Sequence, residues 1–118
     1  MKLKTLLIAL APLLLGACSS TSSAIDPEGT WGSGAPGQPQ LVLAADGSLS
    51  GTDGCNRLLG SWELVDDTVE LSELASTMMA CVDVDTWLGA ASTLRVDGDS
   101  VRVLDAAGTE IGTLDRQG

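Results

Sequence analysis

The stretch LLGSWELVDDTVEL, residues 58–71, decides the fold. Segments rich in Leu and Val flank the pair Asp66 and Asp67, and aspartate at such a point favours a tight turn. Residues 68–71 alternate polar and apolar side chains, which is the period of a half-buried strand. We therefore expect a β-hairpin whose two strands are residues 58–65 and 68–71.

Further strand segments lie on both sides of this hairpin. Asp46 and Gly47, a dipeptide typical of hairpin turns, separate two of them on the N-terminal side. The remaining segments follow each other closely, with Asp- and Gly-containing turns between them. The expected strands are residues 40–44, 48–52, 94–96, 101–104 and 111–114. Short strands joined by tight turns predict an antiparallel meander.

One segment has a helical period instead. Its apolar residues at helical spacing are Val84, Trp87, Leu88 and Ala91. An aspartate at position 83 or 85 is placed to cap the first turn. We expect one short helix at residues 84–91, with Trp87 and Leu88 on the core face of the sheet. Trp31, Trp62 and Trp87 are the only aromatic residues, and we expect them in the core rather than at an exposed contact site.

The N-terminal end has the order of a signal peptide. Two lysines precede an apolar run at residues 6–15, and Gly16 and Ala17 place small residues before Cys18. The segment LGAC, residues 15–18, also has the pattern of a lipobox, in which the cysteine thiol takes a diacylglyceryl group. The alternatives are an ordinary secretory signal or a transmembrane helix, but a helix needs about twenty apolar residues to cross a bilayer.

These observations divide the chain into three segments. We predict a signal peptide at residues 1–17, a lipidated Cys18 with a flexible tether at residues 18–28, and a folded domain at residues 29–118. The tether is rich in Ser and has nothing to bury. The domain is long enough for one modest core. Its expected location is extracytoplasmic, with the lipid on Cys18 as its contact to the membrane.

Charge restricts the partners. Beyond the signal peptide, four arginines stand against 16 acidic residues, a net charge of −12, and no lysine remains. Such a surface repels nucleic acid and anionic lipid headgroups. We therefore expect no nucleic-acid partner. The acidic surface serves either a cationic partner or plain solubility.

Two motifs point to a family. Residues 51–62, GTDGCNRLLGSW, resemble the Gly-Cys-Asn core of META domains, and residues 76–81, STMMAC, resemble that family's Thr-x-Met-Ala-Cys signature. The resemblance extends over roughly residues 30–116. Residues 29–40 depart from the family pattern, because they are short and rich in Pro and Gly. The motif residues outside the cysteines are Gly54, Asn56, Arg57, Thr77, Met79 and Ala80.

The resemblance implies a mainly β (α+β) fold: a small curled antiparallel meander, barrel-like, with one short helix packed on it. The family includes a heat-inducible bacterial lipoprotein. The family is linked to tolerance of cell-envelope stress, and the resemblance implies no catalytic residues. The folded segment is thus expected to be a META-like domain.

The cysteines follow from counting. Three cysteines less the lipidated Cys18 leave Cys55 and Cys81, an even number in a compartment where disulfides persist. We expect a Cys55–Cys81 disulfide; two buried free thiols are the alternative. A redox role is disfavoured by the long spacing and acidic surroundings. Zinc is disfavoured because the chain has no histidine.

Asn56 and Arg57 have a structural interpretation and a ligand-binding one. An Asn after Gly54 can hold a tight bend and bond its own backbone. Arg57 is expected to pair with Asp53 or Glu63. We favour these structural roles over recognition of a ligand.

Enzyme classes are poorly supported. Without histidine or tyrosine the chain offers no Ser/His or Cys/His pair for nucleophilic catalysis. The carboxylate pairs fall where turns and caps favour aspartate, and none has the spacing of a calcium loop. These pairs are Asp66 with Asp67, Asp83 with Asp85, and Asp97 with Asp99. We expect no enzyme activity, cofactor or metal.

Two function classes remain. The first is a monomeric, non-enzymatic envelope lipoprotein that acts in stress tolerance through an unknown protein partner. The second is a small extracytoplasmic binding or inhibitor module for an apolar ligand or a cationic protein. An exposed apolar patch on the folded domain would favour the second class.

Overall fold

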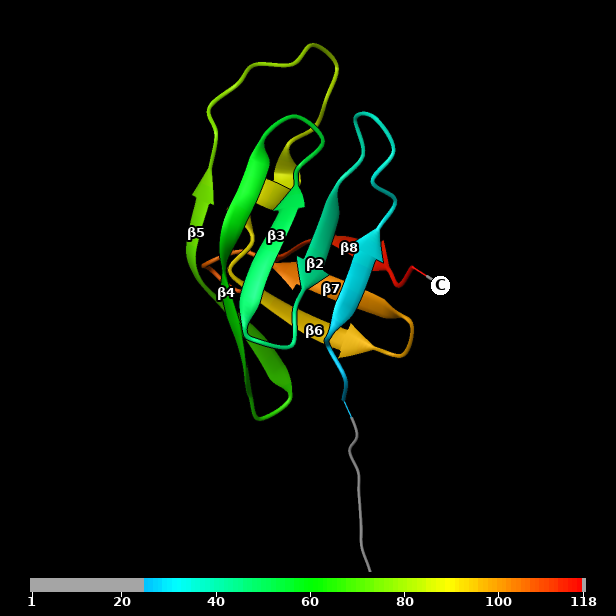
Figure 1. Ribbon diagram of the computed structural model, residues 1–118, viewed down its shortest axis with the longest axis vertical. Helices are drawn as coiled ribbons and strands as arrows, with labels where there is room; N and C mark the ends of the chain where they lie inside the picture. The colour runs from blue at the N-terminus through cyan, green and yellow to red at the C-terminus, as the bar shows by residue number, and fades with distance from the viewer. Residues whose placement is uncertain (1–24, 118) are drawn as a thin grey trace, which may run out of the picture.

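The computed structural model describes residues 25–117, so the predicted signal peptide, Cys18 and most of the tether lie outside the described residues. Within them, eight antiparallel strands form one sheet in which each strand pairs with its neighbours in sequence (Figure 1). One 3₁₀ turn, η1 (Trp87–Ala90), precedes β6. The strands are β1 (Gly29–Gly32), β2 (Gln40–Leu43), β3 (Ser48–Thr52), β4 (Arg57–Val65), β5 (Thr68–Ser76), β6 (Thr93–Asp97), β7 (Ser100–Leu104) and β8 (Glu110–Asp115).

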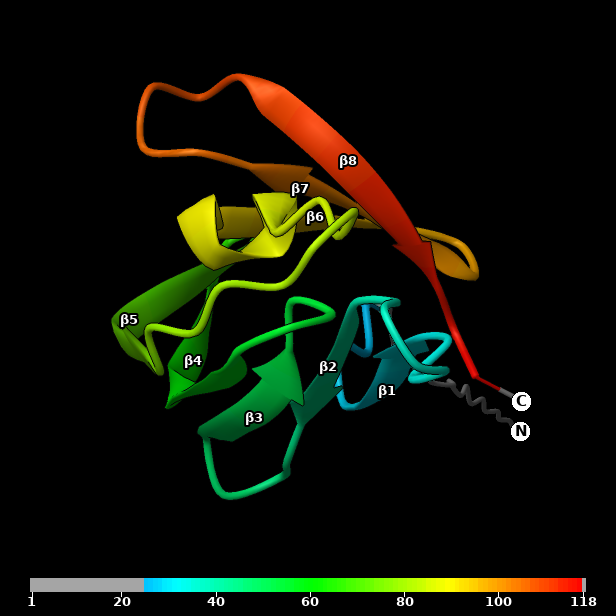
Figure 2. The same cartoon turned by 90° about the horizontal axis from the view of Figure 1, so that it is seen from above.

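The sheet curls until its first and last strands approach each other (Figure 2). Trp31 of β1 forms an isolated antiparallel bridge with Arg116, just beyond β8. The backbone N–H of Gln117 donates to the carbonyl of Thr30 at 2.8 Å, and the Gln117 side chain donates to the Gly32 carbonyl at 2.6 Å. The expected curled, barrel-like meander is therefore confirmed as a nearly closed sheet.

The core fills the inside of this curl. Successive side chains of a strand point to opposite faces of the sheet, so every second one points into the curl. In β7, for example, Val101 and Val103 are buried and Arg102 between them is exposed. Trp62 and Trp87 are partly buried and pack against the core. Its fully or almost fully buried members are Trp31, Leu41, Leu43, Leu49, Leu58, Val69, Leu88, Leu94, Val101, Val103 and Leu114. The expected tryptophan-containing core is confirmed.

The hairpin around Asp66 and Asp67 is confirmed, but its second strand is longer than predicted. β5 continues five residues past the expected end and remains paired with β4. A register shift lies between Leu59 and Ser61, and Glu73 opposite it has a positive φ of 54°. This irregularity interrupts the polar and apolar alternation, which is why the pattern did not reveal the extension.

The Asp46 turn between β2 and β3 is also confirmed. Gly47 has a φ of 90°, which suits glycine at a hairpin turn. The Asp46 carboxylate accepts from the Ser48 hydroxyl at 2.7 Å and from the Ser48 backbone N–H at 2.9 Å. These hydrogen bonds, the side-chain one first, lower the pKa of Asp46 below its ordinary value.

The predicted helix at residues 84–91 is wrong in length. Only η1 forms, its N-terminal flanking residue is Thr86, and no side chain caps it. Neither aspartate acts as the expected cap: Asp83 has a φ of 62°, outside the helical region. So short a segment gains little from helical hydrogen bonds alone. Its placement is as expected, since Leu88 is buried and Trp87 packs on the core.

No helix among the described residues is long and apolar enough to span a membrane.

Trp87 contacts β8 at Gly112. A Cβ at Gly112 would lie 2.5 Å from two ring atoms of Trp87, so the indole occupies the space that any other residue would need. We expect Gly112→Val to lower the free energy of unfolding by about 1–3 kcal/mol through overpacking. Urea unfolding measures the change. Thr113→Val, on the exposed side of the same strand, is the control and should stay within about 0.5 kcal/mol; equal losses would contradict the packing argument.

Candidate functional site

The two family-like motifs meet at one end of the sheet. The first forms the loop between β3 and β4, and the second forms the loop after β5, here called the methionine loop (residues 77–82). Cys55 and Cys81 join them through a disulfide with an S–S distance of 2.00 Å across 26 residues of sequence. The predicted bridge is confirmed. With both sulfurs in the bridge, neither is available as a thiolate ligand.

Asp53 organises the first loop. Its Oδ1 accepts from the backbone N–H groups of Cys55 at 2.9 Å and Asn56 at 2.6 Å. Asp53 is only 2% exposed. Gly54 follows with a φ of 101°, and a Cβ there would lie 2.8 Å from the Gly37 carbonyl oxygen. Both the conformation and the close approach of the neighbouring loop therefore explain glycine at this motif position.

Asn56 fastens the first loop to the second. Its Oδ1 accepts from the Met79 N–H at 2.5 Å and from the Thr77 hydroxyl at 3.1 Å. Its Nδ2 donates to the Met79 carbonyl and to Asp53 Oδ2, both at 3.4 Å. We expected Asn56 to bend its own turn, which is wrong: Asp53 holds that turn, and Asn56 reaches across to the other motif. Its polar atoms are engaged within the protein, as the structural interpretation requires.

Arg57 does not form the expected ion pair with Asp53 or Glu63. The ion pairs among the described residues belong to Arg102 and Arg116, and Arg57 is exposed. Its backbone has the structural role instead. The Arg57 N–H donates to the Thr77 hydroxyl at 3.0 Å, and the Thr77 N–H donates to the Arg57 carbonyl at 3.2 Å. Thr77 is thus held from both sides.

The methionine loop is the most exposed apolar part of the domain. Met78 is 93% exposed, Val82 87% and Met79 63%. Ala80 is exposed as well. Figure 1 shows this loop arching over one end of the sheet, while the chain that leads into β1 lies at the other end. Sequence reasoning placed the motif here but not its exposure, because apolar residues beside a cysteine give no sign of whether they are buried.

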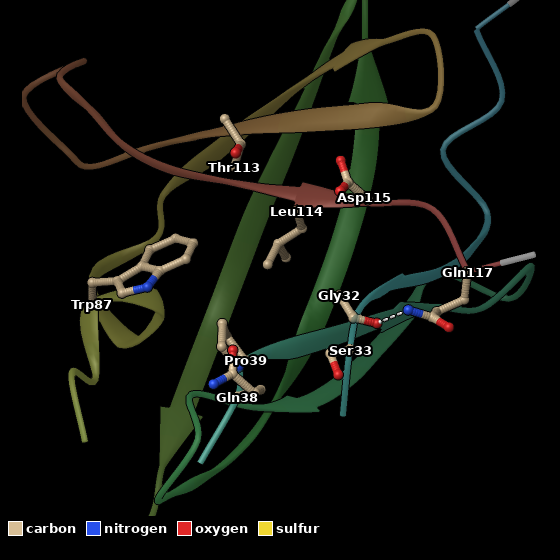
Figure 3. A pocket seen from close by; sticks show the side chains of 9 residues that line it. All are labelled: Gly32, Ser33, Gln38, Pro39, Trp87, Thr113, Leu114, Asp115 and Gln117. Atoms are coloured by element: carbon tan, nitrogen blue, oxygen red, sulfur yellow. Dashed lines mark hydrogen bonds between the residues drawn. The ribbon is translucent and has the colours of Figure 1, made fainter. Parts of the chain in front are cut away.

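Hollows lie on two other parts of the surface. One of about 330 Å³ lies between the β1–β2 loop and β8, where Leu114 and Trp87 face Pro39 (Figure 3). Another of about 390 Å³ lies over β2 and β3 beside Cys55 and Arg57. Within the described residues, no group of three or more potential metal ligands is brought together. The two hollows and the exposed methionine loop are the surfaces that this part of the chain offers for contact.

Comparison with known proteins agrees with this geometry. A family model for the META domain matches residues 21–117, which includes both motifs and all eight strands. No match was found among curated proteins or among solved structures. The two motifs by which the sequence resembles the family are the two loops that the disulfide and Asn56 hold together. The chain belongs to the META-domain family.

Proposed function

We propose that the chain is a membrane-anchored, extracytoplasmic META-domain lipoprotein with a non-enzymatic role in cell-envelope stress tolerance. The Cys55–Cys81 disulfide is the main support for the extracytoplasmic location, because disulfides persist mainly outside the cytoplasm. The LGAC segment before and at Cys18 supports lipid attachment. The lipid on Cys18 is the contact with the membrane, and the domain acts as a monomer.

The use of the motif side chains supports a non-enzymatic role. The Asp53 carboxylate is engaged in hydrogen bonds to the backbone of its own loop. The side chains of Asn56 and Thr77 are engaged in hydrogen bonds that join the two loops. A catalytic group must instead present a free acid, base or nucleophile to a substrate. The motif is thus better suited to holding the methionine loop in place than to carrying out a reaction.

Lipid attachment is tested by labelling. In bacteria that express the full chain and are grown with radioactive palmitate, we expect label on the wild type and none on Cys18→Ala. The wild type should enter the membrane fraction, since two or more acyl chains bind membranes stably. The double variant Cys55→Ala/Cys81→Ala is the control and should keep its label. An unlabelled, soluble wild type would contradict the proposed anchor.

The stress role is tested separately in the host. A strain lacking the chain should survive heat or detergent treatment less well than its parent. The wild-type gene should restore survival, and Cys18→Ala should restore it only weakly if the role requires the membrane. Equal survival of deletion and parent strains under both treatments would contradict the stress role without affecting the anchor.

A second candidate is a binding or inhibitor module for a cationic protein. The exposure of Met78, Met79 and Val82 favours it, because exposed apolar groups that cluster in one loop mark interaction sites more often than scattered ones do. Methionine suits such a site, since its flexible thioether adapts to a partner surface.

A further inference from the structure

We propose that the methionine loop binds and inhibits a serine protease with an apolar primary-specificity pocket, and that Met78 is the side chain that enters this pocket. The inference rests on the second candidate function, the binding module, and names its partner class. It needs neither the lipid anchor nor the stress role.

Met78 lies in a segment without regular secondary structure. Residues 77–81 belong to no helix, strand or turn, so no helix or strand has to unfold before a protease binds them as an extended chain. Met78 is unbranched, apolar and almost fully exposed. No charged residue lies between Glu73 and Asp83. Met78 is thus the most exposed of the long apolar side chains on this loop. A long apolar side chain on a protruding loop matches a deep apolar pocket rather than a flat surface.

The residues on either side of Met78 are fixed by the rest of the domain. Thr77 is bonded through its N–H and hydroxyl to Arg57 and Asn56. Met79 is bonded through both its N–H and its carbonyl to the Asn56 side chain. Cys81 is tied to Cys55. A loop already held in one conformation loses little conformational entropy on binding, so its contacts contribute more fully to affinity.

The same constraints protect the loop from turnover. Hydrolysis of the Met78–Met79 peptide bond adds one water and leaves a carboxylate on Met78 and an amine on Met79. Both new ends would remain attached, one through Thr77 and the other through Asn56 and the disulfide. The products therefore stay in the protease site and can rejoin, which makes the loop an inhibitor rather than a substrate.

Charge favours a protein partner over a lipid surface. Residues 25–117 carry four arginines and 16 acidic residues, with exposed Asp83 and Asp85 just after the loop. Such a field attracts a cationic protease and speeds its association. It opposes an anionic bilayer, and the loop has neither the Trp nor the Lys that membrane-surface segments use.

The test measures inhibition of α-chymotrypsin and subtilisin, assayed with small peptide substrates. Trypsin is assayed in parallel, because its primary-specificity pocket takes Lys or Arg instead of an apolar side chain. The full chain carrying Cys18→Ser is used, so that no lipid is present. We expect inhibition of chymotrypsin or subtilisin with an inhibition constant of about 1 μM or lower, as preformed protease–inhibitor contacts give. Met78→Asp should abolish it. Because the primary-specificity pocket decides which side chain a protease accepts, Met78→Lys should inhibit trypsin at least about a hundredfold more strongly than the unsubstituted chain does.

Val82→Lys is the matched control, since it adds the same charge at a similarly exposed position of the loop, 87% exposed against 93% for Met78. It should leave chymotrypsin and subtilisin inhibition unchanged and should not inhibit trypsin. Three results would overturn the inference. They are no inhibition of chymotrypsin or subtilisin by the unsubstituted loop, with or without cleavage between residues 78 and 79; no trypsin inhibition by Met78→Lys; or Met78-dependent flotation with phosphatidylethanolamine/phosphatidylglycerol vesicles and no effect on any protease. The palmitate-labelling result is independent of all three.

Discussion

Removal of the Cys55–Cys81 disulfide is expected to lower the free energy of unfolding by about 3–4 kcal/mol. The bridge closes a loop whose ends are 26 residues apart, so it removes many conformations from the unfolded chain. Domains of this size have a net stability of only about 5–15 kcal/mol. The loss should therefore appear as a fall in Tm of roughly 15–25 °C.

The double variant Cys55→Ala/Cys81→Ala measures this loss, because it leaves no free thiol in the domain. Urea unfolding of the wild type, oxidised and reduced, gives an independent value. Cys18→Ser is the control, since it changes a cysteine but keeps the bridge. A loss below about 1 kcal/mol would contradict the loop-closure argument, and it would mean that the Asn56 hydrogen bonds alone hold the two loops.

The strands were predictable where side chains alternate next to an unambiguous turn. Asp46 with Gly47 and Asp66 with Asp67 marked two of the hairpins, and strands form on both sides of each turn, although β5 extends beyond its expected end. Each of these signals is local, since it needs only four to eight neighbouring residues. The antiparallel order followed from short turns, which leave a strand little choice except to pair with the previous one.

The features that the sequence did not reveal depend on distant contacts. η1 is shorter than its helical spacing predicts, and the closure of the sheet depends on Trp31 meeting Arg116 from the far end of the chain. Residues 85 positions apart give no pattern that a local reading can detect. Trp87 is placed by its contact with Gly112, which equally lies outside any local window.

The candidate site was likewise predictable only where its signals did not depend on distant contacts. The cysteine count was enough to pair Cys55 with Cys81. The acceptor for the first loop, Asp53, had a local signal two residues before Cys55, where an aspartate can form an Asx turn. The link from Asn56 to Met79 spans 23 residues, and only the folded sheet brings these two together.

Trp31→Ala is expected to lower the free energy of unfolding by about 3–5 kcal/mol, the range for a large core residue. The Trp31 side chain is fully buried, and its Nε1 donates to the Pro27 carbonyl at 2.9 Å. The Arg116 guanidinium lies 4.1 Å from the ring centroid. Truncation therefore opens a cavity where the first and last strands meet, and it also removes the ring over which the Arg116 guanidinium lies.

Arg116 makes this prediction specific to closure of the sheet. Its guanidinium donates to the carbonyls of Glu28 at 2.9 Å and Asp26 at 2.7 Å, so it ties the segment before β1 to the end of β8. Trp31→Phe should cost less than Trp31→Ala, because a ring remains beneath the cation. Arg116→Gln should cost about 1–2 kcal/mol through lost charged hydrogen bonds, whereas Arg95→Gln, at an exposed site on β6, should change little.

A double-mutant cycle between Trp31→Phe and Arg116→Gln measures the coupling directly. We expect about 0.5–1 kcal/mol, because the guanidinium lies over the Trp31 ring. Urea unfolding supplies all four stabilities, and hydrogen exchange of the Gln117 N–H reports whether its bond to Thr30 persists. A coupling near zero with faster exchange only in Trp31→Ala would assign the closure to core packing. Loss of protection in Arg116→Gln as well would assign it to the ring and the cation together.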